Sequence, residues 1–341
     1  MEKIVFNVGP GTEAYVGSGA VKMLGAAVSS AVRGEKAALV TDRNIPEAHV
    51  DSVKSELKAS GFSVSVLAIA GGEKNKRLPT VEEVYGFLYD SGITRADAVI
   101  GLGGGVTGDI AGFAAATYMR GISYFAVPTT IIAQTDSAFG GKTGVDLRSG
   151  KNLIGCFYHP KAVVCDTDLL KTLPEKERVN GMGEVIKYGA IGDPSILDSV
   201  SGFLPSDDMI ALCVKIKKKY VEADEYDLGE RHILNFGHTY GHAIEEASDY
   251  SVPHGQAVAY GMLSMIRLGE KLSLTGSETF GAVRSALLRA GLDAGFEPYA
   301  SDAFLYLSRD KKSDGKRIDA VLLRRPGEAF LKKLTLDELR L

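Results

Sequence analysis

The segment Ala98–Asp109, with the sequence AVIGLGGGVTGD, decides the fold class of this 341-residue chain. It opens on an apolar run typical of a buried strand, and small residues suited to a helix follow it. Gly103, Gly105 and Gly108 satisfy the pattern G-x-G-x-x-G, in which glycines let the backbone approach a pyrophosphate at a helix N-terminus. The pattern alone also fits a tight turn, but its position between a strand and a helix favours a dinucleotide-binding loop.

Strand and helix patterns alternate around this segment. Strands are expected at 36–42, 62–69, 98–102 and 124–128, and helices at 47–60 and 78–91. This alternation predicts βαβ units and a parallel sheet covered on both faces. An ordinary Rossmann domain fits poorly, because the glycine loop follows the third or fourth strand rather than the first. Asp42 ends a strand, where it could hold an adenosine ribose or cap a helix, and the two interpretations weigh about equally.

The second half of the chain has a different pattern. Helical periodicity dominates at 177–191, 206–222, 237–248, 255–274 and 278–290. The change falls near Thr172-Leu173-Pro174, where the proline can open a helix. We therefore expect an α/β domain at 1–172 with a parallel sheet and an all-α domain at 173–341, since the chain exceeds the usual size of a single core.

Composition excludes several classes of protein. The net charge of −4 argues against a nucleic-acid-binding surface. No apolar run is long enough to span a membrane, and the N-terminus lacks the features of a signal peptide. The three cysteines, Cys156, Cys165 and Cys213, form no C-x-x-C pair and favour a reducing compartment. The sequence therefore predicts a soluble cytoplasmic protein.

Three of the six histidines lie between residues 238 and 254. His238 and His242 are four residues apart, so on a helix their side chains leave the same face. With His254 and the helical Glu184 they offer the mixed nitrogen and oxygen ligands that suit zinc. A lone histidine is more often a core residue, and only one of His238 and His242 need be a ligand. The H-E-x-x-H pattern of metalloproteases is absent, because Thr239 follows His238.

Several cations lie in distinctive surroundings. Lys142 and the tripeptide Gly150-Lys151-Asn152 occur in glycine-rich segments that we expect to be mobile, and they suit a phosphorylated or carboxylated substrate. A P-loop is excluded because Asp136 occupies the position of its first glycine. The run of lysines at 215–219 lies on an expected helix, where only one or two side chains can face inward.

Taken together, these motifs resemble the 3-dehydroquinate synthase family of sugar phosphate cyclases over nearly the whole chain. The motifs that carry the resemblance occur in the following order: Gly103–Asp109, Pro128–Thr130, Asp136-Ser137, Gly140–Gly144, Gly150–Asn152, Gly183–Lys187, Arg231, Leu234–His238 and Asp310–Lys312. The resemblance implies an N-terminal NAD-binding domain, a C-terminal helical domain and an active site in the cleft between them.

The family also implies roles for particular residues. The metal, zinc or cobalt, would be held by Glu184, His238 and His254, leaving His242 for the substrate. NAD would be contacted by Asp42, Gly71, Gly72, Glu73, Lys74, Asn75, Lys76, Gly105, Val106, Thr107, Gly108, Asp109, Thr129, Thr130, Lys142, Lys151, Leu169, Leu170, Lys171, Thr172 and Glu177. The substrate would be contacted by Asp136, Lys142, Asn152, Lys187, Lys217, Arg231, Asn235, His242 and the pair Lys311-Lys312. Arg120 would reach the site of a neighbouring subunit, which implies a homodimer.

The resemblance implies a reaction as well. 3-Deoxy-D-arabino-heptulosonate 7-phosphate (DAHP) would be oxidised transiently by NAD, lose phosphate, be reduced again and close by an intramolecular aldol step to 3-dehydroquinate. Zinc would polarise the hydroxyl that is oxidised. One departure is visible, since Asp227 stands where the family usually has glutamate.

Three alternatives are compatible with the same motifs. A related cyclase, such as 2-deoxy-scyllo-inosose or 2-epi-5-epi-valiolone synthase, binds substrates without the DAHP carboxylate. Arg231, Lys217 and the motif Asp310-Lys311-Lys312 favour a carboxylated substrate instead. A metal-dependent polyol dehydrogenase would release NADH. A non-catalytic protein that binds NAD and zinc would not need to retain all these cations.

Overall fold

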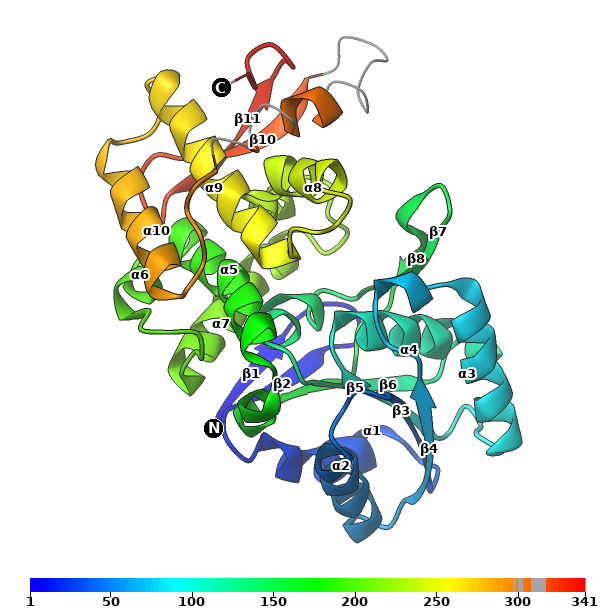
Figure 1. Cartoon of the computed structure of the whole chain (residues 1–341). Coiled ribbons are helices and arrows are strands. Elements are labelled where there is room, and N and C mark those ends of the chain that lie inside the picture. The colour runs from blue at the N-terminus through cyan, green and yellow to red at the C-terminus, as the bar shows by residue number, and fades with distance from the viewer. Residues whose placement is uncertain (297–298, 300–302, 308–316, 341) are drawn as a thin grey trace. The chain divides into compact units, whose positions relative to one another are not determined.

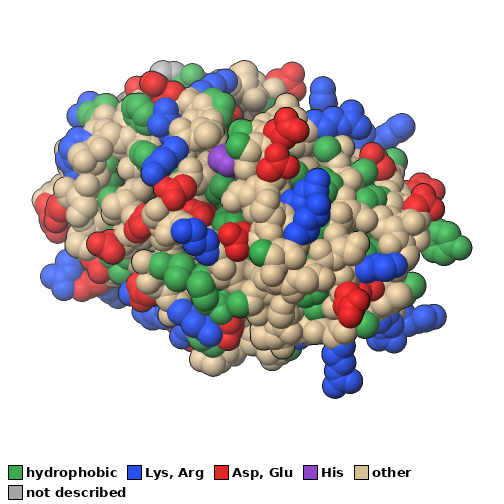
Figure 2. All heavy atoms as spheres, turned by 90° about the horizontal axis from the view of Figure 1, so that it is seen from below, with side chains coloured by type: hydrophobic (Ala, Val, Ile, Leu, Met, Phe, Trp, Pro, Cys, Tyr) green, Lys and Arg blue, Asp and Glu red, His purple; other side chains and the backbone are tan. Residues whose placement is uncertain are grey.

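The structure is a computed structural model that describes residues 1–296, 299, 303–307 and 317–340. The chain divides into two compact units, Met1–Leu173 and Pro174–Leu341. No helix in the described ranges is long and apolar enough to cross a membrane. Basic and acidic side chains are interspersed on the face drawn in Figure 2.

The first unit is built on a seven-stranded sheet (Figure 1). Its strands, in spatial order, are β1 (Glu2–Phe6), β2 (Thr12–Val16), β9 (Ala162–Cys165), β6 (Ser123–Pro128), β5 (Ala98–Gly103), β3 (Lys36–Asp42) and β4 (Ser63–Ile69). From β2 to β4 the strands are parallel, as predicted. β1 is antiparallel to β2, because a short turn with Gly9 and Gly11 at positive φ returns the chain directly.

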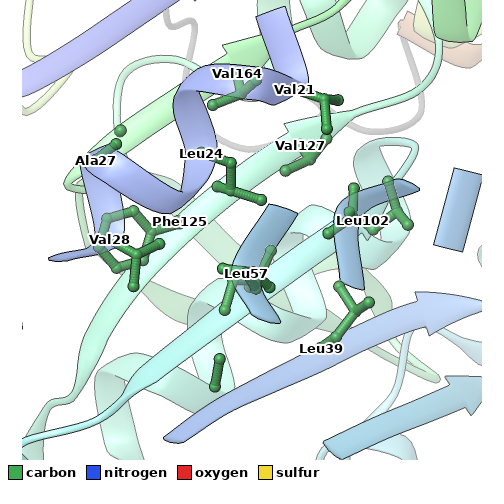
Figure 3. Close-up of a cluster of buried hydrophobic side chains, with 14 of the residues drawn as sticks. Val21, Leu24, Ala27, Val28, Leu39, Leu57, Leu102, Phe125, Val127 and Val164 are labelled. Carbon is green, nitrogen blue, oxygen red and sulfur yellow. The ribbon is translucent and has the colours of Figure 1, made fainter. Parts of the chain in front are cut away.

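Helices cover both faces of this sheet. α1 (Leu24–Ala31) and α2 (Glu47–Ala59) lie on one face, and α3 (Leu78–Asp90) and α4 (Gly105–Thr117) on the other (Figure 1). Every residue of β5 is buried, which explains its uninterrupted apolar and small sequence. Figure 3 shows Leu24 and Leu57, from α1 and α2, in the same apolar cluster as Phe125 of β6. This core fixes β5, and with it the glycine loop that follows.

A separate hairpin of β7 (Lys142–Leu147) and β8 (Gly150–Phe157) belongs to the same unit. Lys142 and Asn152 thus lie on paired strands, and the mobility expected for these glycine-rich segments stays a prediction. A Cβ on Gly144 would lie 2.4 Å from the carbonyl oxygen of Ile154, so the glycine serves close pairing of the two strands.

The second unit is mainly helical. Its helices include α5 (Glu175–Ile191), α6 (Ser195–Ser199), α7 (Asp207–Ala223), α8 (His238–Ala247), α9 (His254–Lys271) and α10 (Glu278–Arg289). α9 is buried along most of its length and contacts α5, α8 and α10. The expected helices are thus present, and the fold class is confirmed in these terms.

The expectation of an all-α second domain needs one correction. β10 (Ile318–Leu323) and β11 (Ala329–Leu334) pair antiparallel as a two-stranded sheet. A turn closes the hairpin, in which the N–H of Arg324 donates to the carbonyl of Glu328. The hydrophobic side chains of β10 are buried, and this burial stabilises a strand pair that helical periodicity does not reveal.

Candidate functional site

The predicted metal ligands come together in the second unit from three helices. Glu184 lies inside α5, and His238 and His254 are the first residues of α8 and α9. Nε2 of His238 lies 3.3 Å and Nε2 of His254 lies 3.1 Å from the same oxygen, Oε1 of Glu184. One ligand atom of each residue lies within 4.8 Å of the others, so the three could hold one metal ion.

Glycines allow these helices to approach. A Cβ on Gly255 would lie 1.7 Å from the carbonyl oxygen of Asn180, and a Cβ on Gly183 would lie 2.5 Å from that of Gly255. The side chain of Asn180 also accepts a hydrogen bond of 2.6 Å from the N–H of Gly255, at the otherwise unpaired start of α9. α5 therefore holds α9 at the residue next to His254.

Both candidate histidine ligands are oriented through their second ring nitrogen. Nδ1 of His238 lies 3.2 Å from the carbonyl oxygen of Phe236, and Nδ1 of His254 lies 3.3 Å from Oε2 of Glu245. Metal-bound histidines commonly donate their other N–H to a carbonyl or carboxylate. The donor set of two imidazoles and one carboxylate, oriented in this way, fits a zinc or cobalt ion.

The charges around Glu184 keep it ionised. Burial alone would raise its pKa, but Nζ of Lys187, 2.5 Å from Oε2, and the ring of His238 hold the pKa well below its usual range. Burial alone would lower the pKa of His254, but hydrogen bonds to Glu184 and Glu245 raise it to about 10. A metal ion bound to His254 would therefore displace a ring proton that Glu184 and Glu245 already attract.

His242 lies one turn after His238 and is exposed. Its ring centroid lies 5.3 Å from that of His238 and 6.2 Å from that of His254. His242, Glu245 and His254 form a second group whose ligand atoms could share an ion. The assignment of the metal to Glu184, His238 and His254 therefore stays a prediction, supported by the better burial of Glu184.

The other substrate residues predicted in this unit fall into two sets. Lys187, Lys217 and Arg231 are buried, and Nη1 of Arg231 donates a hydrogen bond of 2.7 Å to the carbonyl of Glu225. Of the lysine run on α7, only Lys217 is buried, as the helical spacing predicts. The second set, Asn235 and His242, lines a pocket next to α8. His232, His238, Arg317 and Asp319 line the same pocket. Lys311 and Lys312 lie outside the described residues.

The glycine loop in the first unit joins β5 to α4 as predicted. Gly104 is the N-cap of α4, so Gly105 and the residues after it form the first turn of the helix. The hydroxyl oxygens of Thr129 and Ser137 are buried and form no hydrogen bond among the described residues. A Cβ on Gly105 would lie 3.1 Å from Oγ of Ser137. Unpaired donors beside a helix N-terminus suit the diphosphate of a dinucleotide.

Lys76 connects two other predicted residues. Its buried Nζ lies 2.6 Å from Oδ2 of Asp109 and donates a hydrogen bond of 2.6 Å to Oδ1 of Asn152. Burial raises the pKa of Asp109 to about 6, although the ammonium group of Lys76 opposes the shift. Asn152 has a φ of 56°, and its N–H donates to Asp146, so its position on β8 is well defined. The pair of Lys76 and Asn152 links a predicted cofactor residue to a predicted substrate residue.

Asp42 ends β3 without capping a helix. The N-cap of α2 is Pro46, and Oδ1 of Asp42 instead accepts hydrogen bonds from the backbone and side chain of Asn44. The helix-cap interpretation is therefore wrong, because the chain makes a turn before α2 begins. A Cβ on Gly71 would lie 1.7 Å from Oδ2 of Asp42, which explains a glycine at that position.

The remaining predicted residues are distributed as follows. Gly72, Glu73, Lys74 and Asn75 lie in or beside a short 3₁₀ turn, and Leu169, Leu170, Lys171 and Thr172 in another. Val106, Thr107 and Gly108 lie in the first turn of α4, Thr130 follows β6, Asp136 lies in a π-helical turn, Lys142 begins β7 and Lys151 lies on β8. Glu177 lies in the first turn of α5, and Arg120 is exposed with a φ of 67°.

Sequence reasoning did not assign functions to three residues that the structure connects to these sites. Glu245 orients His254, Asn180 holds the start of α9, and Ser137 adds a buried hydroxyl beside the glycine loop. Only Ser137 had a sequence signal, as part of the Asp136-Ser137 motif. The other two contacts join different helices and have no local pattern.

Comparison with known proteins is consistent with this geometry. Residues 66–180 match the model of the 3-dehydroquinate synthase N-terminal domain, and residues 181–313 match that of the C-terminal domain. A 3-dehydroquinate synthase of Clostridium acetobutylicum is 42% identical over 333 residues, covering 95% of this chain and 94% of the relative. One of Streptococcus thermophilus is 40% identical over 332 residues, covering 94% of each.

A solved structure of 2-deoxy-scyllo-inosose synthase, complexed with carbaglucose-6-phosphate, NAD+ and Co2+, has the same fold. Its TM-score is 0.86 at 26% identity, covering 99% of this chain and 98% of that chain. The matches to 3-dehydroquinate synthases extend over nearly the whole sequence at higher identity. The chain therefore belongs to the 3-dehydroquinate synthase family.

Proposed function

We propose that this chain converts DAHP to 3-dehydroquinate and phosphate, with NAD as a recycled cofactor and zinc or cobalt as the metal. The observation that carries the proposal is the 42% identity to a 3-dehydroquinate synthase over 95% of the chain. The Glu184, His238 and His254 cluster supports it, because three protein ligands suit a catalytic metal that keeps a position open for the substrate alcohol.

The metal would be held by Glu184, His238 and His254. When bound, it supplies a Lewis acid that lowers the pKa of the substrate hydroxyl, which makes hydride loss to NAD easier. Lys187 would keep Glu184 ionised, and His254 must give up its Nε2 proton for that nitrogen to bind the ion. His242 would face the substrate.

NAD would bind on the first unit. The glycine loop at Gly103–Asp109 offers backbone N–H groups to the diphosphate, and the buried hydroxyl of Thr129 offers a further donor. Asp42 would hold the adenosine ribose, and Lys76 and the two 3₁₀ turns would complete the contacts. The proposed NAD site also includes Lys142, Lys151, Thr130 and Glu177.

The substrate's two anionic groups require separate cations. Lys217 and Arg231 would bind the carboxylate, and the bond from Nη1 of Arg231 to the carbonyl of Glu225 fixes the plane of the guanidinium. Lys142, Asn152, Asn235 and His242 would bind the phosphate. Asp136 and Lys187 would contact the reacting part of the substrate and hold it in place.

We also propose that the protein is a cytoplasmic homodimer. Arg120 is exposed, as a residue that serves a neighbouring subunit's site must be. The three cysteines, all among the described residues, form no disulfide, which suits a reducing compartment. Sedimentation of the purified protein tests the dimer. A mixture of two inactive variants, Arg120→Ala and Lys187→Met, should then regain activity if Arg120 acts across the interface.

One assay tests the proposed reaction. Purified protein with zinc, NAD and DAHP should release phosphate and form 3-dehydroquinate without net NADH. Phosphate release from glucose 6-phosphate or sedoheptulose 7-phosphate but not from DAHP would identify another cyclase. Steady accumulation of NADH with glycerol would identify a polyol dehydrogenase.

A further inference from the structure

We propose that Glu245 is a positioning residue of the metal centre, whose carboxylate holds the ring of His254 so that Nε2 faces the metal. This inference rests on the proposed metal site. Glu245 contacts the ligand His254 rather than the metal, and it lies seven residues after His238 on the same face of α8.

The geometry assigns different tasks to the two nitrogens of His254. Nε2 lies 3.1 Å from Oε1 of Glu184, and Nδ1 lies 3.3 Å from Oε2 of Glu245. A neutral imidazole carries its proton on only one nitrogen. If Nδ1 donates to Glu245, the lone pair is on Nε2, which is the nitrogen beside Glu184 and His238.

The two histidines are oriented by different kinds of acceptor. For His238 the acceptor is the backbone carbonyl of Phe236, at 3.2 Å from Nδ1. For His254 it is the side chain of Glu245, which is buried. A substitution can therefore remove the orienting group of His254 and leave that of His238 intact.

The competing interpretation makes Glu245 a ligand. His242, Glu245 and His254 could hold an ion of their own. Nδ1 of His254 would be the ligand atom there, because it is the nitrogen that lies 3.3 Å from Oε2 of Glu245. Two observations favour the positioning role. Glu184 Oε1 lies within 3.3 Å of the Nε2 atoms of two histidines, and Glu184 is more deeply buried than His242, which is exposed.

The experiment measures zinc binding to the purified full chain by competition with a chromophoric chelator, without NAD or substrate. Glu245→Gln keeps a neutral acceptor and should weaken zinc binding about tenfold, and Glu245→Ala about 100-fold, both with one zinc per chain at saturation. Glu270→Gln is the matched control on α9, since this glutamate pairs with Arg267 and should leave zinc affinity unchanged. His242→Ala should also leave it unchanged.

A second readout separates positioning from a loss of fold. In the zinc-loaded wild type, nitrogen NMR of His254 should show the proton on Nδ1. Thermal unfolding of the metal-free variants shows whether Glu245→Ala still folds, and Glu245→Gln keeps the test valid if it does not.

Three outcomes would overturn the inference. Wild-type affinity in both folded Glu245 variants would show that the carboxylate does not act on the metal. A proton on Nε2 of His254, together with weakened zinc binding in His242→Ala, would place the ion in the group with His242. A wild type that binds no zinc would overturn the proposed metal centre itself, and this inference with it.

Discussion

Replacing Gly255 by alanine tests the close approach of α5 and α9 that positions His254. The new Cβ would lie 1.7 Å from the carbonyl oxygen of Asn180 and 2.7 Å from its carbonyl carbon. Ordinary contact begins at 3.4 Å, so the start of α9 must move by about 3.4 − 1.7 = 1.7 Å, because backbone atoms cannot rotate away. The 3.1 Å approach of His254 to Glu184 cannot survive a shift of this size.

The expected effect on stability is a difference of two terms. Overpacking costs roughly 1–3 kcal/mol, and the higher helix propensity of alanine offsets at most about 1 kcal/mol. We expect the free energy of unfolding of the second unit to fall by about 2 kcal/mol, measured by urea denaturation. Zinc affinity should fall by about tenfold or more, since the ligand itself is displaced.

Gly281→Ala is the matched control. Gly281 lies in the exposed part of α10, and a Cβ there meets nothing within 4 Å. This variant should gain about 0.5–1 kcal/mol and bind zinc as the wild type does. If Gly255→Ala is also as stable as the wild type and binds zinc equally well, the helices do not approach as described.

Four further predictions follow from the charges at the two sites. Because its neighbouring carboxylates raise the pKa of His254 to about 10, zinc binding near pH 7 should release about one proton, and the apparent affinity should rise about tenfold per pH unit between pH 7 and 9. Calorimetry in buffers of different ionisation enthalpy counts that proton, and a count of zero refutes the argument. The same raised pKa stabilises the metal-free fold fully below about pH 6.5, and this contribution is lost as the pH rises through 10, which urea denaturation at several pH values would detect. Lys187→Met should destabilise the metal-free protein by about 3 kcal/mol, since it leaves Glu184 buried without the ammonium group 2.5 Å away, and an unchanged urea midpoint contradicts this. Lys76→Met should weaken NAD binding about tenfold or more, because Asp109 loses its partner; equal affinity by fluorescence titration would exclude Lys76 from the cofactor site.

Much of the fold was predictable because the signals are local. The expected strand at 36–42 coincides with β3, and the expected helices at 47–60 and 78–91 differ from α2 and α3 by one residue at the C-terminal end. These elements show the apolar periodicity of one buried face. β10 and β11 were not predicted, since a short hairpin late in the chain is stabilised by its partner strand rather than by its own pattern.

The candidate metal site was likewise predictable only in part. Residue types and helical spacing predicted Glu184 and the histidines as a group. They did not indicate which nitrogen of each histidine would face Glu184, because that depends on acceptors elsewhere, such as the Phe236 carbonyl and Glu245.

The amino-acid sequence by itself determined the alternating strands and helices, the glycine loop at the end of β5 and the residue types of a metal site. Each of these depends on spacing within a few residues. Only the tertiary structure decided that Glu245 meets His254, that Asn180 meets Gly255 and that Lys76 meets Asn152. Each of these contacts joins two different elements, so no local pattern reveals it, and at Gly255 the close packing of backbone against glycine sets the approach to Asn180.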